Sequence, residues 1–124
     1  MIQVLILEDE IPAQKKLLKI FNELALEVTV VDILDSVQSG KSFFSTPKKI
    51  DLIISDIELR DGNAFEIFEE SSIPCPIIFA TAYNQFWMQA FETNGIAYLL
   101  KPFGAEKFKL AWDKFIRLAH QPED

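Results

Sequence analysis

The stretch LIISDIELRDG, residues 52–62, decides the fold, because three apolar residues and a serine lead directly into an aspartate, Asp56. A carboxylate at the end of a buried strand costs free energy unless another group pairs with it or uses it. A short, nearly continuous apolar run is typical of a strand that is covered on both faces of a parallel sheet. The stretch therefore predicts such a sheet, with a functional carboxylate at the end of one strand.

The rest of the chain alternates similar apolar runs with amphipathic segments. Strands are predicted at 2–7, 27–34, 51–55, 76–80 and 96–100, and helices at 12–24, 37–45, 64–71, 84–94 and 105–119. Pro12 suits a first helical turn, and Asn63 and Asn84 are candidate N-caps. We therefore predict a single flavodoxin-like α/β domain, with helices on both faces of a five-stranded parallel sheet in the order 2-1-3-4-5.

Length and composition agree with one globular domain. Of the 124 residues, 49% are hydrophobic and 25% are charged, and no apolar run is long enough to span a membrane. We expect the domain to cover residues 1–119 and residues 120–124 to be a tail or the start of a linker. No basic leader follows Met1, and the single cysteine, Cys75, fits a buried position in a cytoplasmic protein. The net charge of −7 argues against direct nucleic acid binding.

Polar side chains stand where four of the predicted strands end. They are Glu8, Asp9 and Glu10 after the first strand, Asp56 after the third, Thr81 after the fourth and Lys101 after the fifth. Ligands of such sheets bind at the carboxyl ends of the strands. The converging carboxylates suit Mg²⁺, while a lysine and a hydroxyl suit phosphoryl oxygens. Asp56 would then be a nucleophile that forms an aspartyl phosphate.

Each of these residues also has a simpler interpretation, since acidic residues at strand ends often cap a helix or remain solvated. The joint placement at four strand ends is what favours a phosphoryl site.

At these residues the sequence resembles the receiver domains of two-component response regulators, and the resemblance extends over residues 1–119. Four segments carry it: LILEDE (5–10), IISDIELRDG (53–62), FATAYN (79–84) and YLLKPF (98–103). The segment TAYNQFWMQAFETNGIAYLLKPF, residues 81–103, is most similar to receivers that precede a LytTR-type DNA-binding domain.

The resemblance implies a phosphoacceptor site. Asp56 would accept a phosphoryl group from a phosphohistidine of a sensor histidine kinase. Mg²⁺, for which Mn²⁺ can substitute, would be held by Asp9, Asp56 and the backbone carbonyl of Glu58, with Glu8 assisting through water. Glu58 and Tyr83 stand where family members tune the lifetime of the phosphoryl group, and Glu8 and Arg60 replace a more common aspartate and proline.

The resemblance also implies a switch. Lys101 would pair with the phosphoryl oxygens, Thr81 would supply the switch hydroxyl, and Tyr98 would be the coupled aromatic residue. The Lys101–Pro102 bond is expected to be cis. Phosphorylation would change the surface formed by the fourth helix, the fifth strand and the fifth helix. This change would control an attached output domain that regulates transcription, and the same surface could form a homodimer. The domain would take part in its own phosphorylation and dephosphorylation without being an enzyme of the usual kind.

Three other functions compete with this one. A phosphohydrolase with an aspartate nucleophile typically has a second acid two residues later, and Glu58 has this spacing from Asp56. However, 124 residues leave no room for the cap domain of such an enzyme. A flavodoxin would need a Ser/Thr/Gly-rich loop where EDEIPA, residues 8–13, is acidic. A receiver-like interaction module that is never phosphorylated is the principal alternative. The presence of the complete set of site residues argues against it: Glu8, Asp9, Asp56, Thr81 and Lys101.

The fourth predicted helix carries four large apolar residues, Phe86, Trp87, Met88 and Phe91, which we assign mainly to the core. Residues 86–88 span too wide an arc for all to be buried, so at least one should face outward and mark a partner surface.

Overall fold

The computed structural model describes residues 1–119, so the predicted tail at 120–124 lies outside the described residues. The main strands are β1 (Ile2–Leu7), β2 (Val28–Leu34), β3 (Leu52–Ser55), β6 (Ile77–Thr81) and β7 (Gly95–Leu100). The helices are α1 (Ile11–Glu23), α2 (Val37–Phe43), α3 (Phe65–Glu70), α4 (Trp87–Glu92) and α5 (Ala105–Ala119). A small hairpin, β4 (Glu58–Leu59) and β5 (Gly62–Asn63), follows β3.

The five main strands form one parallel sheet in the order β2-β1-β3-β6-β7. This confirms the predicted order 2-1-3-4-5, since β6 and β7 are the fourth and fifth strands of the sheet. Leu7 pairs with Ser55, and Thr81 pairs with Leu100. The residues that follow these pairs therefore emerge at the same edge of the sheet.

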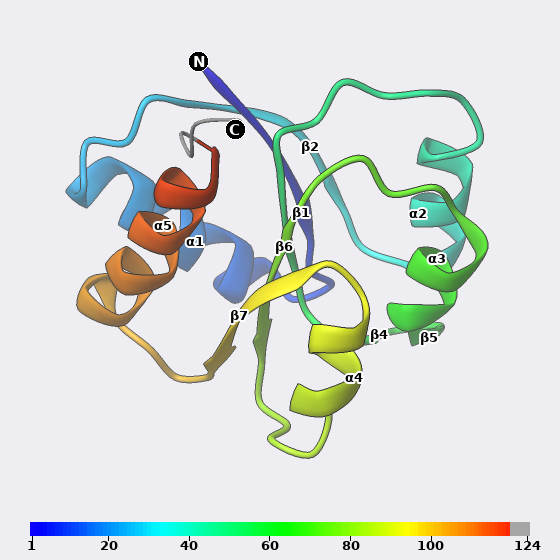
Figure 1. Cartoon of the computed structure of the whole chain (residues 1–124). Helices are drawn as coiled ribbons and strands as arrows, with labels where there is room; N and C mark the ends of the chain where they lie inside the picture. Colours follow the sequence, from blue (N-terminus) through cyan, green and yellow to red (C-terminus); the bar gives the residue numbers. More distant parts are fainter. Residues whose placement is uncertain (120–124) are drawn as a thin grey trace.

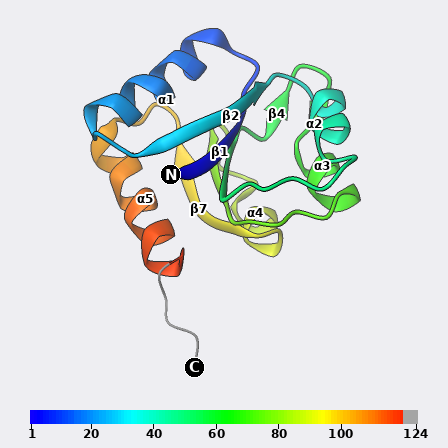
Figure 2. The same cartoon turned by 90° about the horizontal axis from the view of Figure 1, so that it is seen from above.

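Helices cover both faces, as the continuous apolar runs predict. Helices α1 and α5 pack on one face and α2 and α3 lie on the other, with α4 beside β7 (Figures 1 and 2). The core against α1 and α5 includes Phe21, Phe108 and Trp112, and the opposite core includes Ile67 and Phe79. The central strands β3 and β6 are buried on both sides along their whole length.

The start of α4 differs from its prediction. The helix begins at Trp87 with Phe86 at the N-cap, so the predicted start at residue 84 and the Asn84 cap are wrong. Residues 84–86 form a bend and a turn that precede the helix instead.

The start of α3 agrees in part with its prediction. The N-cap position is Ala64, yet the Asn63 side chain accepts a hydrogen bond of 2.8 Å from the Phe65 amide. Asn63 thus satisfies an early amide of the helix, as the sequence predicts, from one residue before the cap.

Several local predictions are confirmed. Pro12 lies in the first turn of α1, Cys75 is buried, and the Lys101–Pro102 bond is cis. Within the described residues, no helix is both long and apolar enough to cross a membrane.

Candidate functional site

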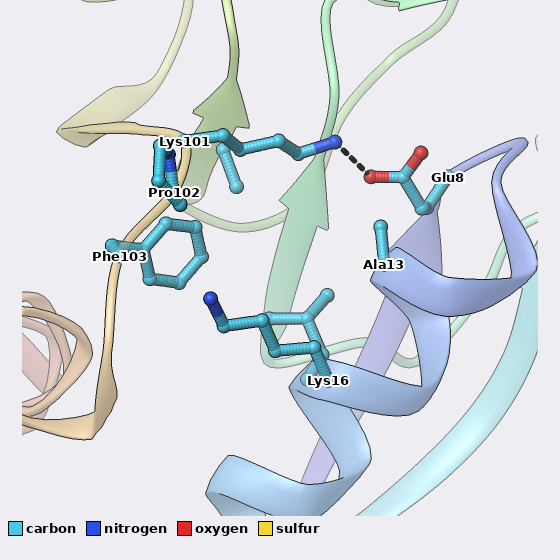
Figure 3. Close-up of a pocket in the computed structure, with 8 residues that line it drawn as sticks. Glu8, Ala13, Lys16, Lys101, Pro102 and Phe103 are labelled. Atoms are coloured by element: carbon cyan, nitrogen blue, oxygen red, sulfur yellow. Dashed lines mark hydrogen bonds and ion pairs between the residues drawn. The ribbon is translucent and has the colours of Figure 1, made fainter.

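The strand ends bring Glu8, Asp56 and Lys101 into direct contact. The ammonium nitrogen of Lys101 lies 2.6 Å from Glu8 Oε1 and 2.9 Å from Asp56 Oδ2. Both carboxylates are almost fully buried, and the lysine is mostly buried. Figure 3 shows the Lys101 side chain reaching across the end of the sheet to Glu8. The predicted convergence of a lysine and carboxylates is therefore present.

The backbone around Asp56 fixes its position. Its own amide donates to the Leu7 carbonyl at 2.8 Å, which continues the β1–β3 pairing by one residue. The Ile57 amide donates to Asp56 Oδ1 at 2.6 Å, while Oδ2 faces Lys101. Each carboxylate oxygen thus has a positively polarised partner, and the two contacts together fix the orientation of the carboxylate.

Burial and mutual contacts shift the pKa values of Glu8 and Lys101. Burial raises the pKa of Glu8, the hydrogen bond from Lys101 lowers it, and the charge of Asp56 raises it again, with a net shift upward. Burial alone would lower the pKa of Lys101, but the hydrogen bonds and charges of Glu8 and Asp56 outweigh burial and raise it. Lys101 is therefore a permanent cation at neutral pH, placed between two acidic groups.

Three successive acidic residues provide oxygen atoms for a cation. One carboxylate oxygen from each of Glu8, Asp9 and Glu10 can lie within 4.8 Å of the others, and their exposure rises from buried to exposed along the series. The Glu10 amide donates to Glu8 Oε2 at 3.2 Å, which orients the second oxygen of that carboxylate. A set of hard oxygen donors with an open side fits Mg²⁺, which keeps several water ligands.

Thr81 and Tyr98 are linked through the backbone of Tyr83. Thr81 is fully buried, and its hydroxyl oxygen accepts a hydrogen bond of 3.3 Å from the Tyr83 amide. The Tyr98 hydroxyl donates to the Tyr83 carbonyl. A movement of the Thr81 hydroxyl would therefore act on the same backbone segment that holds the Tyr98 ring.

Tyr83 also faces the acidic side of the site. The charge of Glu58 and a hydrogen bond with it raise the pKa of the Tyr83 hydroxyl, and the charges of Asp56 and Glu10 add to this shift. Both Glu58 and Tyr83 are exposed, so this contact lies on the surface of the domain.

An apolar cavity of about 140 Å³ lies beside the Glu8–Lys101 pair, between α1 and the segment after β7 (Figure 3). Its lining includes Ala13, Leu17, Pro102 and Phe103, and the Lys16 ammonium lies 5.7 Å from the centroid of the Phe103 ring. Asp56 does not line it. The cavity is too apolar for a phosphoryl group, so the charged site is the cluster of Glu8, Asp56 and Lys101 at the carboxyl ends of the strands.

The prediction for the fourth helix is partly wrong and partly confirmed. Trp87, Met88 and Phe91 are 53%, 58% and 49% exposed, so they are not core residues. The expected outward-facing aromatic residue is therefore present. Leu100 on β7 is also exposed, and the ammonium of Lys114 on α5 lies over the Phe91 ring. The exposed apolar side chains thus belong to α4 and β7, and β7 packs against both α4 and α5.

Two residues beside the site have contacts that the sequence analysis did not assign. Asp61 accepts hydrogen bonds from the amides of Val37 and Gln38, and Arg60 pairs with Asp35 at 3.3 Å. The Asp61–Gly62 dipeptide is a signal for a turn, but no local pattern indicates which distant amides its carboxylate will meet.

Comparisons with known proteins agree with this geometry. Residues 4–113 match the family model of the response regulator receiver domain. The sensory transduction protein LytT of Bacillus anthracis is 36% identical over 118 residues, which are 93% of this chain and 47% of the relative. The transcriptional regulatory protein LytR of Staphylococcus aureus is 31% identical over 115 residues, or 90% of this chain and 46% of the relative. The chain thus spans about half the length of these curated relatives.

A solved structure has the same fold. The response regulatory domain of protein mrkE from Klebsiella pneumoniae superposes with a TM-score of 0.85 at 24% identity, covering 98% of this chain and all of the other.

Proposed function

Because the chain belongs to the family of response regulator receiver domains, we propose that it accepts a phosphoryl group on Asp56 and uses that group to switch the surface of α4, β7 and α5. The observation that carries the proposal is the Asp56 carboxylate itself. It lies directly after β3, with Lys101 2.9 Å from one oxygen and the Ile57 amide 2.6 Å from the other.

Phosphorylation begins with attack by an Asp56 oxygen on the phosphorus of a phosphohistidine in a sensor histidine kinase. A P–O bond forms as the P–N bond breaks, and the imidazole nitrogen retains the electron pair of the broken bond. The buried contacts of Asp56 with Lys101 and the Ile57 amide orient the nucleophile before the phosphoryl group arrives.

The donor set suits a bound Mg²⁺, with Mn²⁺ as a substitute. Asp9, Asp56 and the backbone carbonyl of Glu58 would hold it, and Glu8 would assist through water. The ion would supply positive charge against the phosphoryl oxygens. Lys101 would exchange its contact with Asp56 for one with a phosphoryl oxygen and keep its contact with Glu8.

The switch would use the link from Thr81 to Tyr98. A phosphoryl oxygen offers the Thr81 hydroxyl a new acceptor, and the Tyr83 amide that now donates to that hydroxyl would move with it. Tyr98, bonded to the Tyr83 carbonyl, carries the change to the exposed apolar surface beside α4. The phosphorylated state must favour one of two arrangements of this segment for a switch to result.

The exposed surface of α4, β7 and α5 is suited to a protein partner, either an output domain or a second copy of the chain. Since the chain spans about half of each curated relative, the rest of such a protein would hold the output domain, and the names of the relatives favour a transcription regulator of the LytTR type. We place this domain in the cytoplasm with its kinase and leave DNA contact to the output domain.

Phosphate-affinity electrophoresis after treatment with acetyl phosphate tests this assignment of roles. With Mg²⁺ the chain should give a retarded band, and with EDTA it should not. Asp9→Asn should lose the retarded band at low Mg²⁺ concentration, while Thr81→Ala should still be phosphorylated but fail to change the α4 surface in hydrogen exchange. A retarded band that forms equally with EDTA would contradict the metal site, and no band under any condition would favour an unphosphorylated interaction module.

A further inference from the structure

The β4–β5 hairpin directly follows Asp56 and contains only two residue pairs, Glu58 with Asn63 and Leu59 with Gly62. A two-stranded hairpin is at best marginally stable by itself, and one this short needs support from its surroundings. At its base, the Ala64 amide donates to the Ile57 carbonyl at 2.7 Å. The tip, residues 60 and 61, needs a second anchor.

Asp61 provides that anchor at the N-terminus of α2. Its Oδ1 accepts from the Val37 amide at 2.6 Å, and its Oδ2 accepts from the Gln38 amide at 3.1 Å. These are the first two amides of a helix, which have no acceptor within the helix. The carboxylate thus joins the hairpin to an element 23 residues or more away along the chain.

The remaining early amides of α2 are satisfied locally. Ser36 Oγ accepts from the Ser39 amide, and Ser39 Oγ accepts from the Ser36 amide, which is a reciprocal capping box. Asp61 therefore binds the first two amides of α2, and the Ser36–Ser39 pair satisfies the amides of Ser36 and Ser39. Of these two sets of hydrogen bonds, only those of Asp61 connect the helix terminus to the hairpin.

The electrostatics favour this contact. Slight burial alone would raise the pKa of Asp61, but the hydrogen bonds from Val37 and Gln38 outweigh it and lower the pKa, with a smaller contribution from Arg60. Arg60 in turn pairs with Asp35 just before α2. Both tip residues of the hairpin are thus tied to the β2–α2 connection.

From this geometry we infer that Asp61 is a positioning residue for the metal site, holding the hairpin so that the Glu58 backbone carbonyl stays beside Asp56. The inference rests on the proposed function, in which that carbonyl is a ligand of Mg²⁺. Without the Asp61 anchor the tip would be released, and the carbonyl would have to be ordered again each time the ion binds. The loss should therefore appear as weaker Mg²⁺ binding.

Isothermal titration with MgCl₂ alone, without a phosphodonor, measures this directly. Asp61→Ala should bind Mg²⁺ about 10-fold more weakly than the parent, as is common when a group that orients a metal ligand is removed. Asp61→Asn keeps one acceptor oxygen and should lose less. In phosphorylation by acetyl phosphate, Asp61→Ala should need more Mg²⁺ for half-maximal rate and approach the parent rate at saturation.

Ser36→Ala is the matched control, because it removes a cap from the same helix terminus without touching the hairpin. It should lower the thermal midpoint by an amount similar to that for Asp61→Ala and leave Mg²⁺ affinity at the parent value. Equal Mg²⁺ affinity in the parent and Asp61→Ala would overturn the inference and make Asp61 a helix cap only. A fall in affinity for Ser36→Ala as large as that for Asp61→Ala would also overturn it. A parent chain that binds no Mg²⁺ would overturn the proposed metal site, and this inference with it.

Discussion

Lys101 donates a hydrogen bond of 2.6 Å to Glu8, although 93 residues separate the two along the chain. The contact spans the carboxyl ends of β7 and β1, which are not neighbours in the sheet. The same ammonium reaches Asp56, directly after β3, so one lysine joins three strand ends. The charged cluster at this edge is therefore held together by Lys101.

Removing that lysine should destabilise the fold at neutral pH. Lys101→Met leaves two nearly buried carboxylates without their cation, and breaking a buried ion pair in this way costs roughly 3 kcal/mol. The pKa of Glu8 already lies above 4.5, so the loss should shrink as the pH falls toward that value and Glu8 takes up a proton. Urea unfolding at pH 7 and pH 5 measures the change.

The double variant Lys101→Met with Glu8→Gln is the control for that experiment. It removes one of the two buried carboxylates that have lost their cation, and it should recover part of the stability lost at pH 7. Equal stability of Lys101→Met and the parent at pH 7 would contradict the account of the cluster.

The Tyr98 hydroxyl should stabilise the segment that follows β6. Tyr98→Phe removes its hydrogen bond to the Tyr83 carbonyl, and an exposed bond of this kind contributes about 0.5–1 kcal/mol. Hydrogen exchange of residues 82–86 should become faster. Tyr83→Phe keeps the backbone carbonyl and should leave that exchange close to the parent rate; faster exchange in both variants would show that the carbonyl contact is not the cause.

Gly95 should tolerate no side chain. A Cβ at this position would clash with the Ala90 carbonyl oxygen, a backbone atom of α4 that cannot turn away. Gly95→Ala should therefore lower the free energy of unfolding by about 3 kcal/mol through overpacking. Gly104→Ala is the matched control, because a Cβ there meets nothing within 4 Å. Similar stability of the two variants in urea would contradict the packing of α4 against β7.

The anchor formed by Asp61 should weaken in acid. Its pKa in the folded chain lies below the ordinary value of 3.8, so the unfolded state takes up a proton first as the pH falls. The stabilisation is therefore complete above about pH 5 and is lost as the pH falls through the folded-state pKa. In urea unfolding, the stability difference between the parent and Asp61→Asn should narrow below pH 4. A constant difference from pH 7 to pH 3 would contradict the stabilisation by the ionised Asp61 carboxylate.

The sheet could be predicted from the sequence because its strands are buried on both faces. Continuous apolar runs such as 52–54 leave few alternatives to a central parallel strand, and the right-handed crossover rule then limits the order. The placement of Glu8, Asp56, Thr81 and Lys101 at one edge follows directly from that order. This part of the site needed no tertiary information beyond the sheet itself.

The remaining details depend on contacts that no local pattern encodes. The β4–β5 hairpin was not predicted, since strands of two residues give no periodic signal. Trp87 was assigned mainly to the core on its hydrophobicity, but it is exposed at the first position of α4. The direct Glu8–Lys101 bond and the Asp61 anchor join distant segments, so only the folded chain reveals them.

The most direct test of the central claim is the intact mass of the chain after treatment with acetyl phosphate and Mg²⁺, measured beside Asp56→Asn. The account predicts a mass gain of one phosphoryl group in the parent, its loss on treatment with hydroxylamine, and no gain in Asp56→Asn. An unchanged mass in a folded parent that binds Mg²⁺, or an equal gain in Asp56→Asn, would contradict the assignment of Asp56 as the phosphoacceptor.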